Sequence, residues 1–150
     1  MIEVGSKAPE FDLPAVGGGR ASAATLRGRR YALYFYPKAD TSGCTVQAQG
    51  VQENLQALER AGITVIGVSP DPVKKLDAFA RKFGLTFTLA SDAEQSLATA
   101  YDAWVEKSMY GRKYMGMERS TFFVSADGTV EAIWRKVKPA DHAALLLAAA

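Results

Sequence analysis

The sequence predicts an α/β fold in which helices cover both faces of a mixed central β-sheet. Residues 31–36 and 63–68 are continuous apolar runs of the kind that forms buried strands. Between them, residues 44–61 place apolar side chains at helical spacing, and Gly62 follows as a stop signal. This order predicts two parallel strands joined by a helix.

Several shorter elements are predicted in the rest of the first two thirds of the chain. An N-terminal β-hairpin is expected around residues 11–13, with the glycine triplet 17–19 as its loop. A phosphate cradle is the less favoured interpretation of that triplet, because no Lys-Ser/Thr pair follows it. Residues 104–118 show no clean period, so we expect a long loop lying over the domain. The other expected elements are a helix at 72–83, a short strand at 87–90 and a short helix at 93–101.

The last third of the chain adds an antiparallel pair of strands and a closing helix. Residues 121–124 and 129–134 are predicted strands, and Asp127-Gly128 between them is a strong hairpin signal. Pro139 stands near the start of a final helix, where its fixed φ is tolerated. The complete order describes a thioredoxin-like fold. We expect residues 1–150 to form a single domain, because no linker or internal repeat divides them.

The composition is that of an ordinary globular protein, and it argues against several classes of partner. Of 150 residues, 48% are hydrophobic and 23% charged, and 18 basic against 16 acidic residues leave a formal charge of +2. This charge is too small, and the basic residues are too scattered, for a nucleic-acid surface. No apolar stretch approaches the ~20 residues that span a bilayer, and the first residues lack the pattern of a signal peptide. We therefore expect a cytoplasmic protein that binds neither nucleic acid nor membrane.

Cys44 is the only cysteine in the chain. One cysteine excludes a disulfide framework, a CxxC redox pair and a multi-cysteine zinc site. We accordingly expect neither a metal nor a cofactor. A lone cysteine is most often a small buried apolar group, but the residues around this one favour a chemical role.

Cys44 opens a predicted helix, and the loop before it contains Thr41 and Gly43. A helix N-terminus carries about half a positive charge and free backbone N–H groups, which favour a thiolate, the nucleophilic form of cysteine. If that thiolate displaced one oxygen of a peroxide, negative charge would grow on the leaving oxygen, and hydrogen-bond donors would have to face both oxygens. Thr41 can supply a hydroxyl, Gly43 lets the backbone approach closely, and Pro37 can shield the sulfur from water.

These residues resemble the peroxidatic loop of the peroxiredoxin family. The family pattern P-x3-T-x2-C is met by Pro37, Thr41 and Cys44, and the subgroup resembled is the bacterioferritin comigratory protein, or peroxiredoxin Q, type. Further matching stretches run along nearly the whole chain: Gly5-Ser6-Lys7-Ala8-Pro9, Gly67-Val68-Ser69, Lys107-Ser108-Met109-Tyr110-Gly111, Glu118-Arg119-Ser120-Thr121-Phe122, and Lys136-Val137-Lys138-Pro139 with His142. The resemblance implies a thiol-specific peroxidase that reduces hydrogen peroxide and organic hydroperoxides.

The resemblance also implies a role for Arg119 and a mechanism with one cysteine. Arg119 matches the family's active-site arginine, whose guanidinium would stabilise the thiolate and the developing oxyanion. Many relatives carry a resolving cysteine where this chain has Gln49, and Ser42 stands where the family usually has proline. Cys44 would form a sulfenic acid that an external thiol reduces, such as thioredoxin, a glutaredoxin or a low-molecular-weight thiol. Relatives of this type are often monomers, and we expect the same here.

Three alternative functions compete with the peroxidase. A cysteine hydrolase would need His142, the only histidine, as the base for Cys44, but we expect His142 at a solvated helix position far from the cysteine. A thiol-transferase would usually carry a CxxC motif, which Thr41 breaks. A redox-sensing or binding module would signal through oxidation of Cys44 without turnover, and it would need neither Thr41 nor Arg119. Peroxide consumption in the presence of a thiol separates these functions.

Overall fold

The computed structural model describes residues 2–150 and contains a central five-stranded sheet in the order β5-β4-β3-β8-β9. β3 (Arg30–Phe35) pairs in parallel with β4 (Ile63–Ser69), which pairs in parallel with β5 (Thr88–Ser91). On the other side of β3, β8 (Ser120–Val124) and β9 (Val130–Trp134) complete the sheet as antiparallel strands. The predicted mixed sheet and thioredoxin-like fold are confirmed.

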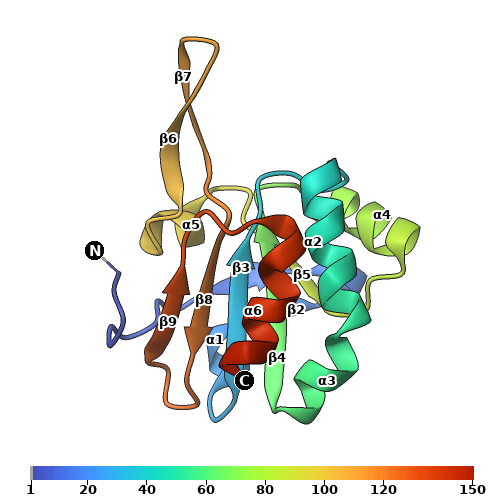
Figure 1. Cartoon of the computed structure of the whole chain (residues 1–150), viewed down its shortest axis with the longest axis vertical. Helices are drawn as coiled ribbons and strands as arrows, with labels where there is room; N and C mark the ends of the chain where they lie inside the picture. The colour runs from blue at the N-terminus through green and yellow to red at the C-terminus, as the bar shows by residue number, and fades with distance from the viewer. Residues whose placement is uncertain (1) are drawn as a thin grey trace.

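Helices cover both faces of this sheet (Figure 1). α2 (Ser42–Glu53), α4 (Val73–Phe83) and α6 (His142–Ala149) pack on one face. The shorter helical elements are α1 (Ala23–Leu26), α3 (Leu55–Arg60), α5 (Ser96–Ala100) and the 3-10 turns η1 (Val16–Gly18) and η2 (Pro139–Asp141), of which α1 and α5 lie on the opposite face. Among residues 2–150, no helix combines the length and the apolar composition that a membrane span requires.

β3 is the central strand because both of its faces are buried. Leu33 and Phe35 point into a core shared with α5 and the N-terminal hairpin, whereas Ala32 and Tyr34 point into the core under α2, α4 and α6. A strand buried on both faces requires the nearly continuous apolar sequence that is found here. The carboxyl end of β3 therefore leads from the core directly into the loop before α2.

The predicted N-terminal hairpin is formed by β1 (Asp12–Pro14) and β2 (Arg20–Ser22), which pair antiparallel. The glycine triplet lies in the connection between these strands, where Gly17 and Gly18 both have a φ of 75°. This left-handed conformation costs glycine little, since it has no Cβ. The hairpin and its glycine loop are confirmed.

The prediction of a single helix over residues 44–61 is wrong, because the structure has two helices there, α2 and α3, separated at Asn54. The backbone there has φ −106° and ψ 8°, and the Asn54 side chain donates to the Gly50 carbonyl at 2.8 Å. Asparagine side chains compete with the backbone for hydrogen bonds in this way, which makes them poor residues for a helix interior. The break leaves α2 as a separate helix of 12 residues with Cys44 in its first turn.

The long loop predicted over residues 104–118 is also wrong, because this segment forms a second hairpin. β6 (Trp104–Met109) and β7 (Arg112–Met117) pair antiparallel around a turn at Tyr110 and Gly111, where φ is 52° and 77°. The hairpin projects away from the rest of the molecule (Figure 1). Its outer half is exposed on both faces, so its sequence lacks the alternation of apolar and polar residues that identifies a half-buried strand.

Candidate active site

Cys44 is the third residue of α2, at the point where the chain turns back over the carboxyl end of β3. Only 1% of its surface is exposed, and it belongs to the apolar core that contains Tyr34 and Tyr36. The first N–H groups of a helix have no partner within the helix, so the sulfur stands at a terminus that favours negative charge. The predicted place of the cysteine, at the start of a helix after the central strand, is found in the structure.

Arg119 is brought to Cys44 by the pairing of β8 with β3. Ser120 lies opposite Phe35 in this antiparallel register, so the preceding residue, Arg119, reaches the end of β3 and the start of α2. Its Nη1 donates to the Cys44 sulfur at 3.4 Å. A Cβ atom at Gly43 would lie only 3.2 Å from Arg119 Nη2, so the glycine lets the guanidinium approach the helix closely. Two residues 75 positions apart in sequence thus meet at the sulfur.

Gln47 is a member of the site that the sequence reasoning missed. It lies one turn after Cys44 on the same face of α2, it is fully buried, and its Oε1 accepts from Arg119 Nη1 at 2.6 Å. Its Nε2 has no hydrogen-bond partner among residues 2–150. The sequence did contain a signal for this role: Gln47 stands three positions after the cysteine, on the apolar face of the predicted helix, where a polar side chain needs a partner. Buried amides are normally hydrogen-bonded, so Gln47 is placed to orient the guanidinium.

Thr41 and Pro37 lie in the loop that joins β3 to α2. Thr41 occupies the N-cap position of α2, but its hydroxyl donates to the Lys38 carbonyl at 2.8 Å rather than to the helix. The side chain is exposed, whereas Pro37 is half-buried at the start of the loop. The loop is fixed to the sheet by Asp71, whose carboxylate accepts from the Ala39 N–H at 2.7 Å. The structure therefore gathers all four predicted site residues into or beside this loop.

Comparisons with known proteins agree with this geometry. A family model described as the AhpC/TSA family matches residues 4–133. The putative peroxiredoxin bcp of Coxiella burnetii is 44% identical over 143 residues, which cover 95% of each chain. The chain belongs to the AhpC/TSA family of peroxiredoxins. Its activity is that of a thiol-dependent peroxidase, an oxidoreductase.

Other relatives and solved structures place this peroxiredoxin in the bacterioferritin comigratory protein or peroxiredoxin Q group. Peroxiredoxin Bcp of Escherichia coli is 40% identical over 141 residues, which cover 94% of this chain and 90% of the relative. The structure of the Xanthomonas campestris bacterioferritin comigratory protein has a TM-score of 0.88 and 41% identity, over 93% of this chain and 88% of that one. A Xylella fastidiosa PrxQ mutant has a TM-score of 0.94 and 33% identity, over 99% and 95% of the two chains.

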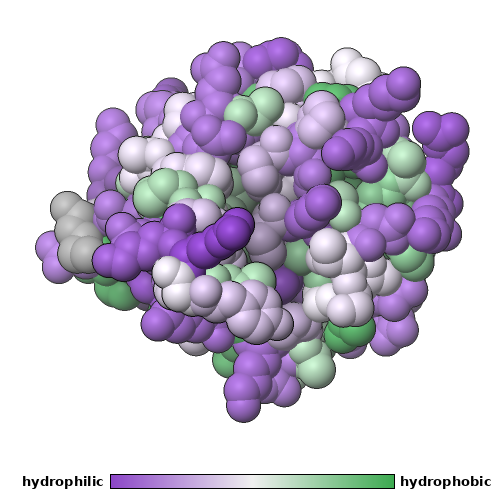
Figure 2. Space-filling view, turned by 90° about the horizontal axis from the view of Figure 1, so that it is seen from above, coloured by the Kyte–Doolittle hydropathy of each residue, from purple (hydrophilic) through white to green (hydrophobic). Residues whose placement is uncertain are grey.

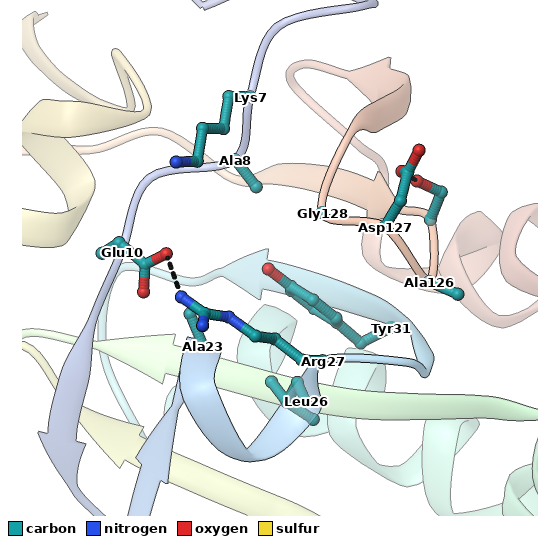
Figure 3. A pocket seen from close by; sticks show the side chains of 11 residues that line it. Lys7, Ala8, Glu10, Ala23, Leu26, Arg27, Tyr31, Ala126, Asp127 and Gly128 are labelled. Carbon is teal, nitrogen blue, oxygen red and sulfur yellow. Dashed lines mark hydrogen bonds and ion pairs between the residues drawn. The ribbon is translucent and has the colours of Figure 1, made fainter.

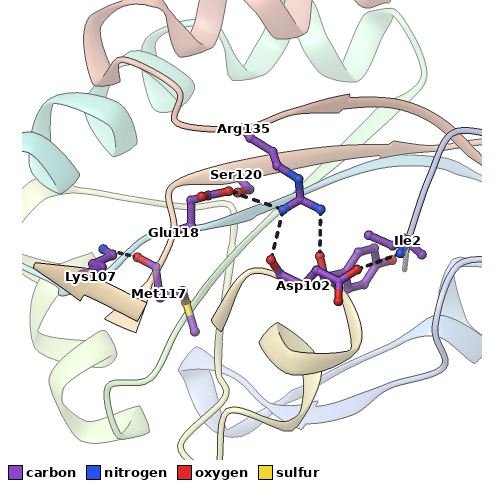
Figure 4. Close-up of polar contacts among 8 residues, drawn as sticks. Ile2, Asp102, Lys107, Met117, Glu118, Ser120 and Arg135 are labelled. Atoms are coloured by element: carbon purple, nitrogen blue, oxygen red, sulfur yellow. Dashed lines mark hydrogen bonds and ion pairs between the residues drawn. The ribbon is translucent and has the colours of Figure 1, made fainter. Parts of the chain in front are cut away.

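Polar contacts hold the residues on either side of Arg119 in this peroxiredoxin (Figure 4). Arg135, the residue after β9, donates to Glu118 Oε1 at 3.4 Å and to two backbone carbonyls that follow α5. From β6, Lys107 Nζ donates to the Met117 carbonyl at 2.6 Å. The two residues before Arg119 are therefore held by one side chain from β6 and one that follows β9.

His142 is fully buried, so the expectation of a solvated helix position is wrong. It begins α6 on the side that packs against the sheet, where its Nε2 lies 2.8 Å from Thr121 Oγ1 and its ring packs on Tyr34 at 4.7 Å. Among residues 2–150, no hydrogen bond joins His142 to Cys44, so the pair lacks the contact that a hydrolase mechanism requires. Burial and the charge of Arg119 lower the pKa of His142 to about 3.

We expect this buried histidine to make stability depend on pH. In the unfolded chain it binds a proton below its ordinary pKa of 6.5, whereas in the folded protein it stays neutral down to about 3. Unfolding therefore takes up a proton between these values, and His142 makes the free energy of unfolding fall as the pH falls, by up to about 1.4 kcal/mol per pH unit. In His142→Gln, which keeps a polar group near Thr121 without titrating, urea unfolding at several pH values should show a smaller slope. An equal slope in the two proteins would mean that folded His142 is protonated.

A separate cavity lies at the opposite end of β3, near the turn between β8 and β9 (Figure 3). Its walls include Leu26, Tyr31 and Asp127, and Arg27 Nη2 donates to Glu10 Oε1 across it at 3.0 Å. Cys44 follows the carboxyl end of β3, whereas Tyr31 stands near the amino end of the same strand. This cavity is therefore not part of the active site.

Proposed function

We propose that Cys44 is the peroxidatic nucleophile of this peroxiredoxin and that Arg119, Thr41 and Pro37 are the catalytic residues around it. The observation that carries the proposal is the 3.4 Å contact between Arg119 Nη1 and the Cys44 sulfur. A guanidinium at this distance stabilises a thiolate, and its remaining N–H groups can donate to a peroxide oxygen. Thr41 stands exposed at the N-cap of the same helix, and its hydroxyl becomes the second donor when it turns from the Lys38 carbonyl toward the peroxide.

In the first half of the reaction, the thiolate attacks one oxygen of the peroxide. The sulfur–oxygen bond forms as the oxygen–oxygen bond breaks, so the sulfur loses two electrons to the peroxide and becomes a sulfenic acid. The other oxygen leaves with a proton as water or an alcohol. Arg119 and Thr41 stabilise the charge that grows on these oxygens, and Pro37 limits access of water to the sulfur.

In the second half, an external thiol returns the electrons. It attacks the sulfur of the sulfenic acid, releases water and forms a mixed disulfide, and a second thiol then frees Cys44 and leaves as a disulfide. The chain cannot replace this thiol, because Cys44 is its only cysteine. We propose thioredoxin, a glutaredoxin or a low-molecular-weight thiol as the reductant, and organic hydroperoxides as well as hydrogen peroxide as substrates.

Trapping the intermediate tests the one-cysteine mechanism. One equivalent of peroxide should leave Cys44 as a sulfenic acid that a dimedone-type reagent captures as a single adduct per chain. Non-reducing gels should show the monomer, or a dimer linked through two copies of Cys44, because no intramolecular disulfide can form. Excess peroxide without a thiol should carry the sulfur to sulfinic acid and stop turnover. Sustained turnover with no thiol present would contradict the mechanism.

We also propose that the protein works as a monomer in the cytoplasm. A chain with one cysteine and no structural disulfide suits a reducing compartment, which supports the cytoplasm. Light scattering of the reduced protein tests the monomer, and fractionation of cells followed by immunoblotting tests the compartment.

A further inference from the structure

A groove beside Arg119 has a composition that the peroxidatic reaction does not explain. It lies between the base of the β6–β7 hairpin and the segment after β9, and its volume is about 590 Å³. Lys107, Arg119 and Lys136 contribute cations to it, and Val105, Tyr114 and Val137 contribute apolar surface. Seen from the side toward which the hairpin projects, the molecule is hollowed near its centre, and hydrophilic and hydrophobic residues both border the hollow (Figure 2).

The cations that line this groove outnumber its carboxylates by three to two. Two carboxylates also line it, but Glu118 accepts from Arg135 at 3.4 Å and Glu106 lies 3.6 Å from Lys113, so other cations already pair with them. Within residues 2–150, no carboxylate lies in ion-pair distance of the three cations of the groove.

The partners of two of these cations are neutral. Lys107 Nζ donates to the Met117 carbonyl, and Arg119 Nη1 donates to the Gln47 amide oxygen. Burial, and then the nearby Arg119 charge, lower the pKa of Lys107, and the opposing effects of Glu118 and Cys44 only partly offset them. An anion in the groove would relieve this repulsion.

We propose that this groove binds the carboxylate of a small organic reactant, so that a carboxylate-bearing thiol or hydroperoxide reacts with Cys44 more efficiently than a neutral one. This inference rests on the proposed function. Within residues 2–150 the Lys136 ammonium has no hydrogen-bond or ion-pair partner, and Lys107 keeps further N–H groups besides the one given to the Met117 carbonyl. The Nη1 of Arg119 is directed at the sulfur, so the two lysines are the groups placed to receive the carboxylate. The apolar groups of the groove would cover the carbon chain, and Arg119, which borders both the groove and Cys44, joins the carboxylate site to the reacting atom.

Matched pairs of reactants test the proposal and identify the source of the carboxylate. In the thiol arm, 3-mercaptopropionate is compared with 2-mercaptoethanol as reductant, with hydrogen peroxide as substrate. In the peroxide arm, the hydroperoxide of an unsaturated fatty acid is compared with its methyl ester, by following formation of the sulfenic acid. The quantity compared between proteins is the ratio of kcat/KM for the charged reactant to kcat/KM for the neutral one. Differences in intrinsic reactivity cancel in this comparison.

Lys136 is the residue to change, because its side chain is exposed at the edge of the groove. Lys136→Gln should lower the ratio about threefold to fivefold in at least one arm, and Lys136→Glu should lower it further. High salt should lower the ratio of the parent protein toward that of Lys136→Gln, since exposed charges are screened. Lys138→Gln, which removes an exposed lysine two positions away and outside the groove, is the control and should leave the ratio unchanged.

A fall in the thiol arm identifies the groove as a reductant site, and a fall in the peroxide arm identifies it as a substrate site. If Lys136→Glu keeps the parental ratio in both arms while hydrogen peroxide is still reduced, the groove proposal is wrong and the peroxidase proposal stands. If the parent protein reduces no peroxide with any thiol, the proposed function itself fails.

Discussion

Replacement of Cys44 by serine is expected to abolish peroxide turnover and leave the protein folded. A serine hydroxyl is not ionised near neutral pH, so the variant has no nucleophile for the peroxide oxygen. The smaller oxygen fits the space of the sulfur, and Arg119 keeps its hydrogen bond to Gln47. Peroxide consumption with a thiol supply measures the activity, and circular dichroism with thermal unfolding checks the fold.

Ser42→Ala serves as the control for this experiment. Ser42 is exposed in the same turn of α2 and carries none of the proposed chemistry, so its removal should preserve turnover. Turnover above a trace in folded Cys44→Ser would show that another group reduces the peroxide, and the proposed mechanism would have to be abandoned.

Arg119→Ala is expected to slow formation of the sulfenic acid by about 10² to 10³. The variant loses the N–H donor that lies 3.4 Å from the sulfur. The thiolate and the negative charge that develops on the peroxide oxygen are then both less stabilised. Single-turnover kinetics of sulfenic acid formation measure this rate. If Arg119→Ala forms the sulfenic acid at the parental rate, the arginine has only a structural role.

The stability of this variant must be measured beside its rate. Removing Arg119 leaves the buried Oε1 of Gln47 without its donor, which costs about 1–3 kcal/mol. Gln47→Met separates the two effects, because it keeps the guanidinium and removes the group that orients it. Arg112→Ala, at the exposed end of β7, is the matched control for loss of an arginine.

The parts of this site that are close in sequence could be predicted from the sequence, and the parts that depend on packing could not. Pro37, Thr41 and Cys44 stand within one short loop between a strand and a helix, so local rules place them together. Arg119 required the family resemblance, because only the register between β3 and β8 brings it to the sulfur. Gln47 was missed because its role depends on that arginine.

The errors in the predicted fold have the same physical origin. Apolar periodicity continues across Asn54, so it does not reveal a helix break that the asparagine side chain makes. The β6–β7 hairpin projects from the sheet, and a strand with little buried surface has no periodic pattern to detect. The burial of His142 follows from the way α6 packs on Tyr34, and a single histidine near a helix start gives no sign of this.

The exposed hairpin affects how oxidation of this protein can be measured by mass. Met109 and Met115 are 56% and 51% exposed on the hairpin, and their thioethers also gain one oxygen from peroxide, as sulfoxides. An intact protein heavier by one oxygen therefore does not identify the oxidised site. The Cys44→Ser protein carries the same methionines, so treating it in parallel gives the methionine contribution alone. The gain of the parent chain over that background counts the oxygen on the sulfur of Cys44.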